Sequence, residues 1–345
     1  MNTPPIKTGV VGYGFSAKTF HIPFINTLAE FDLCTISSSQ TEVVEKDFPQ
    51  AQLYETAIDM IEDSDIDLVI ITAPNDVHFS LAKLALENNK HVILEKPFVT
   101  SSAQGEALIA LAEQKNLVLS VYQNRRWDGD FLTVKKLINE NTLGNVKYFE
   151  THFDRFRPEI RQRWRETATE GGGILFDLGP HLIDQTLQLF GMPSAITAHC
   201  RILREGSNNV DLFNITLHYP DKIAVLQASL FCAGPNTRFK VQGDLGCYEK
   251  MGLDPQEDRL KAGITPTSAE WADEDVESYG HFYDVQTSQV IKTERGGYQH
   301  FFLGVADAIN NNKQPSVTAL EALQGIKLIE LAIESSEKGK TLSIS

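Results

Sequence analysis

Two short segments carry side chains that could move protons. Lys96 follows the apolar run Val92–Leu94 and is followed at once by Pro97. Asp177 and His181 are four positions apart, which places both side chains on one face if their segment is helical. Histidine titrates near neutral pH and is the natural base, whereas a lysine ammonium can hydrogen-bond a substrate oxygen and stabilise negative charge there. Such a pair suits alcohol oxidation, because the hydroxyl proton must be removed as hydride leaves carbon.

The roles within this group stay open at this point. A desolvated lysine can also act as the base, so His181 and Lys96 could exchange roles. Asp177 would hold His181 or a second substrate hydroxyl in register, and Asp184 extends the same helix face. The preceding glycines, 171–173, would let the backbone pass close to a ligand. A surface charge pair and a metal site are the alternatives, but no further ligand completes a metal site nearby, so we expect none.

A glycine-rich loop lies near the start of the chain, between an expected strand and an expected helix. Its sequence is Gly12-Tyr13-Gly14-Phe15-Ser16-Ala17. In nucleotide-binding loops of this kind, the first glycine allows a tight turn, the second admits the pyrophosphate, and the small third residue lets helix and strand pack closely. The helix N-terminus adds free N–H groups and a partial positive charge. We therefore predict a dinucleotide site that includes Gly12, Gly14, Phe15, Ser16 and Ala17, with a plain glycine turn as the alternative.

The end of the second expected strand bears on the choice of nicotinamide cofactor. NAD sites usually place Asp or Glu there to hold the ribose 2′-hydroxyl. Here Ser37, Ser38, Ser39 and Gln40 occupy the segment, and the first carboxylate after it is Glu42. Hydroxyls and an amide can donate hydrogen bonds to a 2′-phosphate, which a carboxylate would repel. We expect the three serines to favour NADP, with NAD as the alternative, although no arginine in the segment holds the phosphate.

Apolar residues follow two different rhythms along the chain. In the first part, short apolar runs alternate with amphipathic helical stretches, which predicts a doubly wound parallel sheet. The strands expected there are Lys7–Val11, Phe31–Ser37, Leu68–Thr72, Val92–Leu94 and Val118–Tyr122, with helices at Val77–Asn88 and Ala103–Lys115. After a helix at Phe131–Glu140, longer strands of alternating polarity indicate a largely antiparallel sheet with one covered face. These strands are Lys147–Phe156, Ala195–Leu203, Val210–Tyr219, Ile223–Leu230 and Arg238–Gln242, and a helix at Ala319–Glu337 ends the chain.

This layout predicts two domains. Residues 1–123 form an α/β Rossmann domain, and residues 124–345 form an α+β domain with a large, mainly antiparallel open sheet. The cleft between the domains would bind cofactor and substrate. Lys96 would then lie at the carboxyl end of a parallel strand, where ligands bind in such sheets.

Bulk composition excludes several classes of protein. The 345 residues are 42% hydrophobic and 22% charged, as in ordinary globular proteins. With 31 basic and 46 acidic residues, the formal charge is −15, which disfavours nucleic acid and anionic lipid as partners. No apolar run approaches the ~20 residues of a membrane helix, and the N-terminus lacks a secretory layout. The four scattered cysteines argue against a zinc site or a disulfide framework, so we expect a cytoplasmic protein.

Taken together, the motifs resemble the Gfo/Idh/MocA oxidoreductase family. The resemblance rests on the glycine loop, on Glu95-Lys96-Pro97 and on the Gly173…Asp177…His181 segment, and it covers nearly the whole chain. It implies that Lys96, Asp177 and His181 are the catalytic set. It also implies further cofactor contacts from Thr72, Pro74, Asn75, His78, Glu95, Lys96 and Asn124. Within the family, segments 122–128 and 153–159 look closest to NADP-dependent scyllo-inositol dehydrogenases, of which many carry arginine where this chain has Gln40.

An arginine-rich segment precedes the glycine run. It contains Arg155, Arg157, Arg161, Arg163 and Arg165 around Trp164. An aromatic ring can pack on the C–H face of a sugar, and arginine forks suit vicinal hydroxyls. We expect Arg155 and Trp164 to contact the substrate beside the catalytic set. The alternative is a solvated loop whose arginines pair with Asp154, Glu159 and Glu166.

These observations predict the oxidation of a secondary alcohol on a cyclic polyol or sugar, similar to scyllo-inositol, by hydride transfer to NADP. An NADPH-dependent reductase of a keto-sugar or aldehyde would use the same residues in the opposite direction. A non-catalytic nucleotide sensor would not need a proton-transfer pair, so Lys96 and His181 count against it. An open sheet needs a cover, and a homodimer or homotetramer would supply one, as the family resemblance also implies.

Overall fold

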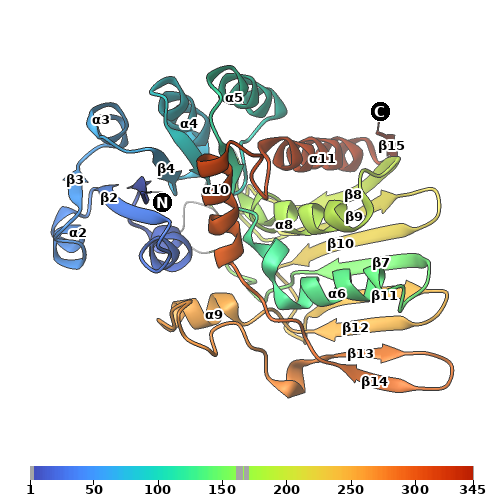
Figure 1. Cartoon of the computed structure of the whole chain (residues 1–345). Helices are drawn as coiled ribbons and strands as arrows, with labels where there is room; N and C mark the ends of the chain where they lie inside the picture. Colours follow the sequence, from blue (N-terminus) through green and yellow to red (C-terminus); the bar gives the residue numbers. More distant parts are fainter. Residues whose placement is uncertain (1–3, 161–165, 167–170, 345) are drawn as a thin grey trace. The chain divides into compact units, whose positions relative to one another are not determined.

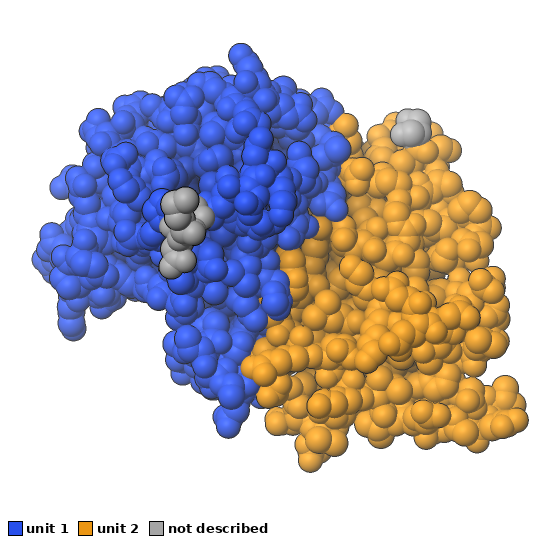
Figure 2. All heavy atoms as spheres, in the orientation of Figure 1, with its two compact units in different colours: residues 1–124, 256–271, 298–323 blue, residues 125–255, 272–297, 324–345 orange. Residues whose placement is uncertain are grey.

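The chain forms two compact units, each built around its own sheet (Figures 1 and 2). The computed structural model describes residues 4–160, 166 and 171–344. Unit 1 consists of residues 1–124, 256–271 and 298–323, and unit 2 of residues 125–255, 272–297 and 324–345.

Unit 1 contains a six-stranded parallel sheet in the order β3-β2-β1-β4-β5-β6. Its strands are β1 (Ile6–Val11), β2 (Phe31–Ser37), β3 (Gln52–Tyr54), β4 (Leu68–Ile71), β5 (His91–Leu94) and β6 (Leu119–Val121). The central strands β4 and β5 are apolar almost throughout because helices cover both faces of the sheet (Figure 1). The strand order reverses between β1 and β4, which is the arrangement of dinucleotide-binding folds and confirms the predicted Rossmann sheet.

Helices connect these strands and complete unit 1. They are η1 (Ala17–His21), α1 (Ile22–Ile25), α2 (Thr41–Asp47), α3 (Ala57–Asp63), η2 (Asn75–Val77), α4 (His78–Glu87), α5 (Ser102–Lys115), α9 (Gln256–Lys261) and α10 (Gln299–Asn311). The helix after the glycine loop starts with the π-helical turn η1 and continues as the short α1. Pro23 lies in the first turn of α1, where its missing N–H removes no helical hydrogen bond.

Two late segments of the chain return to unit 1, whereas the predicted division assigns everything after residue 123 to the second domain. Phe302 of α10 stacks on Phe24 with ring centroids 5.1 Å apart, and Phe301 packs edge-on against Tyr122 at 4.9 Å. Trp271, which follows α9, packs against Phe24 at 5.7 Å. These aromatic contacts bury large apolar areas and hold the returning segments in unit 1.

Unit 2 contains a nine-stranded sheet in the order β14-β13-β12-β11-β7-β10-β9-β8-β15. The strands are β7 (Val146–His152), β8 (Ala195–Arg201), β9 (Leu212–His218), β10 (Ile223–Ser229), β11 (Thr237–Gly243), β12 (Cys247–Met251), β13 (Gly280–Tyr283), β14 (Ser288–Ile291) and β15 (Leu342–Ser343). Every neighbouring pair is antiparallel except β7 with β10. The predicted mainly antiparallel sheet is therefore confirmed, with one parallel pair at its centre.

Helices cover one face of this sheet (Figure 1). The helical elements of the later chain are η3 (Asn124–Trp127), α6 (Gly129–Asn139), α8 (Gly173–Phe190), η4 (Val276–Ser278) and α11 (Ala319–Lys338). Phe149 and Leu226 are buried on the covered face, whereas Tyr148, Glu150 and Thr216 on the opposite face keep partial exposure. The chain's own helices thus cover the apolar face, and the expected homo-oligomer stays a prediction. Over the described residues, no helix is long and apolar enough to cross a membrane.

Candidate functional site

The two glycines of the nucleotide loop differ in what surrounds them. Gly12 has φ +90°, which side chains rarely adopt, and its N–H donates to the Ser37 carbonyl at 2.9 Å. A Cβ at Gly12 would lie 2.9 Å from Oγ1 of Thr72, so the protein's own packing requires this glycine. Gly14 is exposed, and no described protein atom lies within 4 Å of the position of a Cβ. The open space over Gly14 fits the close approach of a pyrophosphate.

The end of β2 turns back toward the glycine loop. Ser37 and Ser38 are buried, whereas Ser39 is exposed. Oγ of Ser38 accepts a hydrogen bond from the Gln40 N–H at 3.0 Å, and Nε2 of Gln40 donates to the Tyr13 carbonyl at 3.2 Å. Of the three serines predicted to favour NADP, Ser39 is therefore the one that faces solvent.

His78 contacts the backbone of the segment that follows β4. Oγ1 of Thr72 donates to the Val11 carbonyl at 2.8 Å. The two ring nitrogens of His78 face the carbonyls of Ala73 and Pro97, each at 3.0 Å, and burial lowers the pKa of this histidine. His78 thus joins the predicted cofactor segment after β4 to the segment after β5, because its two ring nitrogens are directed at one backbone carbonyl in each.

The remaining predicted cofactor residues divide between surface and interior. Phe15 and Pro74 are exposed, whereas Ala17, Asn75 and Asn124 are buried. Their contacts with a cofactor stay predictions.

A buried carboxylate joins the glycine loop to the strand that carries the lysine. Oε1 of Glu95 accepts a hydrogen bond from the Ser16 hydroxyl and faces Nε2 of His21 at 2.8 Å, and Oε2 accepts from the Lys96 N–H at 3.1 Å. Burial alone raises the pKa of Glu95, but the hydrogen bond with His21 and the charges of His21 and Lys96 outweigh it and lower the pKa to about 2. Glu95 is therefore an anion that ties the loop to Lys96.

His21 is a site residue that sequence reasoning missed. It is fully buried, with its ring 4.4 Å from the ring of Tyr122 and 5.8 Å from that of Phe302. Its Nδ1 has no hydrogen-bond partner among the residues described. Its contact with Glu95 joins positions 74 residues apart, which no local pattern reveals.

Lys96 is the second residue after the end of β5, as predicted. It is half-buried, and the Lys96–Pro97 peptide bond is cis. Because β5 runs parallel to β4, and β4 to β1, Lys96 and the glycine loop lie at the same carboxyl edge of the sheet.

In unit 2, helix α8 carries the other predicted catalytic residues one turn apart. His181 is buried, and Asp177 is half-buried. Oδ2 of Asp177 accepts from Nη1 of Arg155 at 3.2 Å, and the Arg155 guanidinium also lies 5.1 Å from the ring centroid of Phe153. The structure thus brings together Asp177 and Arg155, which were both expected to bind substrate.

Asp184, one turn after His181 on α8, has a buried arginine partner. It accepts two hydrogen bonds from Arg126, at 2.8 and 2.7 Å. The next residue, Gln185, donates to the Arg125 carbonyl at 2.7 Å and accepts from Arg238 at 2.6 Å. This buried network, which carries no local sequence signal, anchors α8 to η3 and β11.

Both carboxylates of the alternative metal site have arginine partners in the structure. Asp177 is bound by Arg155, and Asp184 by Arg126. Across the described ranges, no three His, Cys, Asp or Glu side chains gather as metal ligands.

Gly173, at the start of α8, lies close to protein backbone, and the expected approach of the glycine run to a ligand stays a prediction. Gly173 has φ +77°, and a Cβ there would lie 2.9 Å from Cβ of Asn209 and 3.0 Å from N and O of Val210. The N–H of Ile174 donates to the Val210 carbonyl at 3.1 Å. Gly173 is therefore needed where α8 crosses the segment leading into β9.

Much of the arginine-rich segment lies outside the described residues, including Trp164 with Arg161, Arg163 and Arg165. Glu166 forms an ion pair with Arg204 at 2.9 Å, and Asp154 lies 3.1 Å from His152. These described pairs use partners outside the cluster. The expected contact of Trp164 with substrate stays a prediction.

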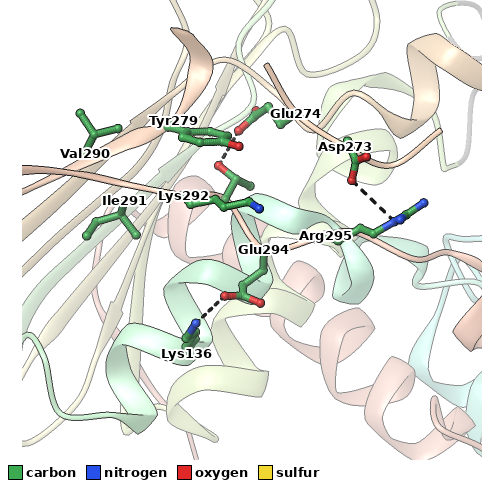
Figure 3. A pocket seen from close by; sticks show the side chains of 10 residues that line it. Lys136, Asp273, Glu274, Tyr279, Val290, Ile291, Lys292, Glu294 and Arg295 are labelled. Carbon is green, nitrogen blue, oxygen red and sulfur yellow. Dashed lines mark hydrogen bonds and ion pairs between the residues drawn. The ribbon is translucent and has the colours of Figure 1, made fainter. Parts of the chain in front are cut away.

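A separate pocket of about 750 Å³ lies within unit 2 (Figure 3). Its lining residues are Lys136, Asp273, Glu274, Tyr279, Val290, Ile291, Lys292, Thr293, Glu294 and Arg295. Most of its charges are paired with one another, as in the contacts of Lys136 with Glu294 at 2.6 Å and Arg295 with Asp273 at 3.7 Å. The described lining includes none of the predicted site residues.

Family models match both halves of the chain. The model described as "Oxidoreductase family, NAD-binding Rossmann fold" matches residues 6–123, and the model described as "Oxidoreductase family, C-terminal alpha/beta domain" matches residues 135–344. The chain belongs to the Gfo/Idh/MocA oxidoreductase family. The predicted family and enzyme class are thereby confirmed.

Relatives of this Gfo/Idh/MocA oxidoreductase match along nearly its whole length. It is 38% identical to scyllo-inositol 2-dehydrogenase (NADP(+)) IolW of Bacillus subtilis (strain 168), over 98% of this chain and 96% of that protein. It is 41% identical to the uncharacterized oxidoreductase YdgJ of Escherichia coli (strain K12), over 99% of each. The solved structure of yvaA from Bacillus subtilis covers 100% of both chains, with a TM-score of 0.96 and 37% identity. The glycine loop, Glu95 and Lys96 therefore belong to an NAD(P)-binding Rossmann domain.

Proposed function

We propose that this enzyme oxidises a secondary alcohol on a cyclic polyol or sugar, similar to scyllo-inositol, with NADP as the hydride acceptor. The observation that carries the proposal is the place of Lys96, which follows β5 at the edge with the glycine loop and is tied to that loop through Glu95. A cation thus stands at the edge where the family's dinucleotide binds. The 38% identity to IolW, which is named an NADP-dependent scyllo-inositol dehydrogenase, supports the substrate class and the cofactor.

The residues have separate roles in this proposal. His181 takes the proton of the substrate hydroxyl, because a neutral imidazole is the suitable base near neutral pH. Lys96 donates a hydrogen bond to the same oxygen and stabilises its growing negative charge. Asp177, which Arg155 holds at 3.2 Å, accepts a hydrogen bond from a second hydroxyl of the polyol. The bound nicotinamide supplies the hydride chemistry.

Gly14 leaves room for the pyrophosphate that NAD and NADP share. At the end of β2, the exposed Ser39 supports the choice of NADP. The positions from Ser37 to Thr41 contain no carboxylate that would repel a 2′-phosphate. NAD remains the alternative cofactor.

The same residues would also serve an NADPH-dependent reductase of a keto-sugar or aldehyde. His181 would then return the proton to the oxygen that Lys96 binds, because one site catalyses both directions. Rates in the two directions distinguish these functions.

The test is a panel of inositol isomers and aldoses with NADP and with NAD, read at the nicotinamide absorbance. The reverse panel uses inososes and keto-sugars with NADPH. We expect turnover of at least one cyclic polyol with NADP, and loss of that turnover in His181→Ala. Tight NADP binding without turnover of any polyol, sugar or keto-sugar would favour a nucleotide sensor and overturn the proposal.

A further inference from the structure

Lys18 is an exposed cation beside the nucleotide loop. It lies on η1, directly after Ala17, the last residue of the loop. Its ammonium stands 4.1 Å from the ring centroid of Tyr13, the residue between the two loop glycines. Within the described chain Lys18 forms no ion pair, and the ring of Tyr13 attracts its ammonium group.

Tyr13 connects this cation to the end of β2. Its carbonyl accepts from Nε2 of Gln40 at 3.2 Å, and its hydroxyl donates to Oδ2 of Asp47 at 2.7 Å. Tyr13 therefore contacts Lys18 through its ring and Gln40, in the turn after β2, through its carbonyl. In doubly wound dinucleotide-binding sheets, this turn is where the adenosine ribose is recognised.

The charges near Tyr13 and the turn after β2 include the Lys18 ammonium and the carboxylates of Asp47 and Glu42. A phosphate monoester carries roughly −1.5 to −2 charges at neutral pH and needs a cationic partner. Gln40 is neutral, and the stretch from Ser37 to Thr41 has no charged side chain. The carboxylate that approaches Tyr13, Asp47, is bound by the phenol O–H, whereas Lys18 lies over the ring.

We propose that Lys18 supplies the cation that binds the 2′-phosphate of NADP and thereby sets the preference for NADP over NAD. Its partners at this phosphate are the exposed hydroxyl of Ser39 and the amide of Gln40. This assignment rests on the proposed use of NADP. It gives Lys18 the role that a strand-end arginine would otherwise have.

The test measures binding of fragments, so it does not depend on activity. Lys18→Met keeps the apolar stem over Tyr13 and removes the charge. We expect Lys18→Met to weaken binding of 2′,5′-ADP by about ten- to hundredfold, the usual effect of losing a charged hydrogen bond, and to leave 5′-AMP unchanged. Lys18→Arg should keep the preference. Lys83→Met, at an exposed lysine on α4, is the matched control and should change neither ligand.

Titration calorimetry of each protein with both fragments separates the outcomes. Persistence of the 2′,5′-ADP preference in Lys18→Met would overturn the role of Lys18 and leave NADP use intact. Equal weakening of both fragments would mean that Lys18 only supports the loop, and would also overturn its role in specificity. A wild-type protein that binds 5′-AMP as tightly as 2′,5′-ADP would overturn the NADP part of the proposed function itself.

Discussion

Glu95 connects the glycine loop to the lysine of the candidate site through one buried carboxylate. The substitution Glu95→Gln keeps the size of the side chain and removes its charge. Ser16, His21 and the Lys96 N–H all approach the Glu95 oxygens, and a neutral amide binds such donors more weakly. We expect the substitution to lower the free energy of unfolding of unit 1 by about 3 kcal/mol near neutral pH.

The pKa of Glu95 sets this magnitude. It is about 2 in the folded protein, against an ordinary value of 4.5. At about 1.4 kcal/mol per pKa unit, the folded state favours the carboxylate over the neutral acid by about 3 kcal/mol, and glutamine mimics the neutral acid. Because the folded pKa lies below the unfolded one, this stabilisation is complete above pH 4.5 and is lost as the pH falls toward 2.

Hydrogen exchange measures the effect within unit 1. The side chains of β4 are fully buried, so we expect its amides to exchange mainly when the unit opens. A loss of about 3 kcal/mol speeds their exchange by about a hundredfold. Urea unfolding at pH 7 and pH 5 gives a second measure, and the difference from wild type should be the same at both values. Glu62→Gln, at an exposed carboxylate of α3, is the control and should change neither measurement.

Two results would refute this reasoning. A loss below about 1 kcal/mol would show that the Glu95 charge contributes no more than an ordinary neutral hydrogen bond. A difference between variant and wild type that grows as the pH falls below 4.5 would contradict the lowered pKa.

Three further predictions concern catalysis, helix anchoring and cofactor choice. His181→Ala and Lys96→Met should each lower kcat by about 10²- to 10⁴-fold, with NADPH affinity nearly unchanged in His181→Ala, and normal turnover would remove that residue from the mechanism. Arg126→Met leaves the Asp184 carboxylate buried without its guanidinium, so urea unfolding should show a loss of about 3–5 kcal/mol; a loss below about 1 kcal/mol would contradict the anchoring role. Ser39→Asp should shift the ratio of kcat/KM for NADP and NAD at least about tenfold toward NAD by charge repulsion, and an unchanged ratio would show that this turn does not discriminate.

Sequence periodicity predicted the interior strands better than the edges. The expected and observed bounds of β2 agree at Phe31–Ser37, and β4 and β5 each differ by one residue at one end. Buried parallel strands are continuous apolar runs, which a sequence displays directly. The edge strand β3 has three residues and β15 has two, and their side chains are at least partly exposed. Neither strand therefore shows a usable alternation of polar and apolar residues.

The candidate chemistry could be predicted from local residue patterns. The glycine loop, Lys96 after an apolar strand, and Asp177 four positions before His181 were all readable, because each depends on residue types within one strand, turn or helix. The sequence also indicated the fold class, since the two rhythms of apolar residues are local properties of the chain.

The contacts that hold these groups in place became visible once the chain was folded. His21 meets Glu95 across 74 positions, and Arg126 meets Asp184 across 58. Tyr13 likewise joins separate elements, because its ring contacts Lys18 of η1 and its carbonyl accepts from Gln40 after β2. Such pairings depend on how buried charges find partners when strands and helices pack, and local sequence spacing carries no record of that packing.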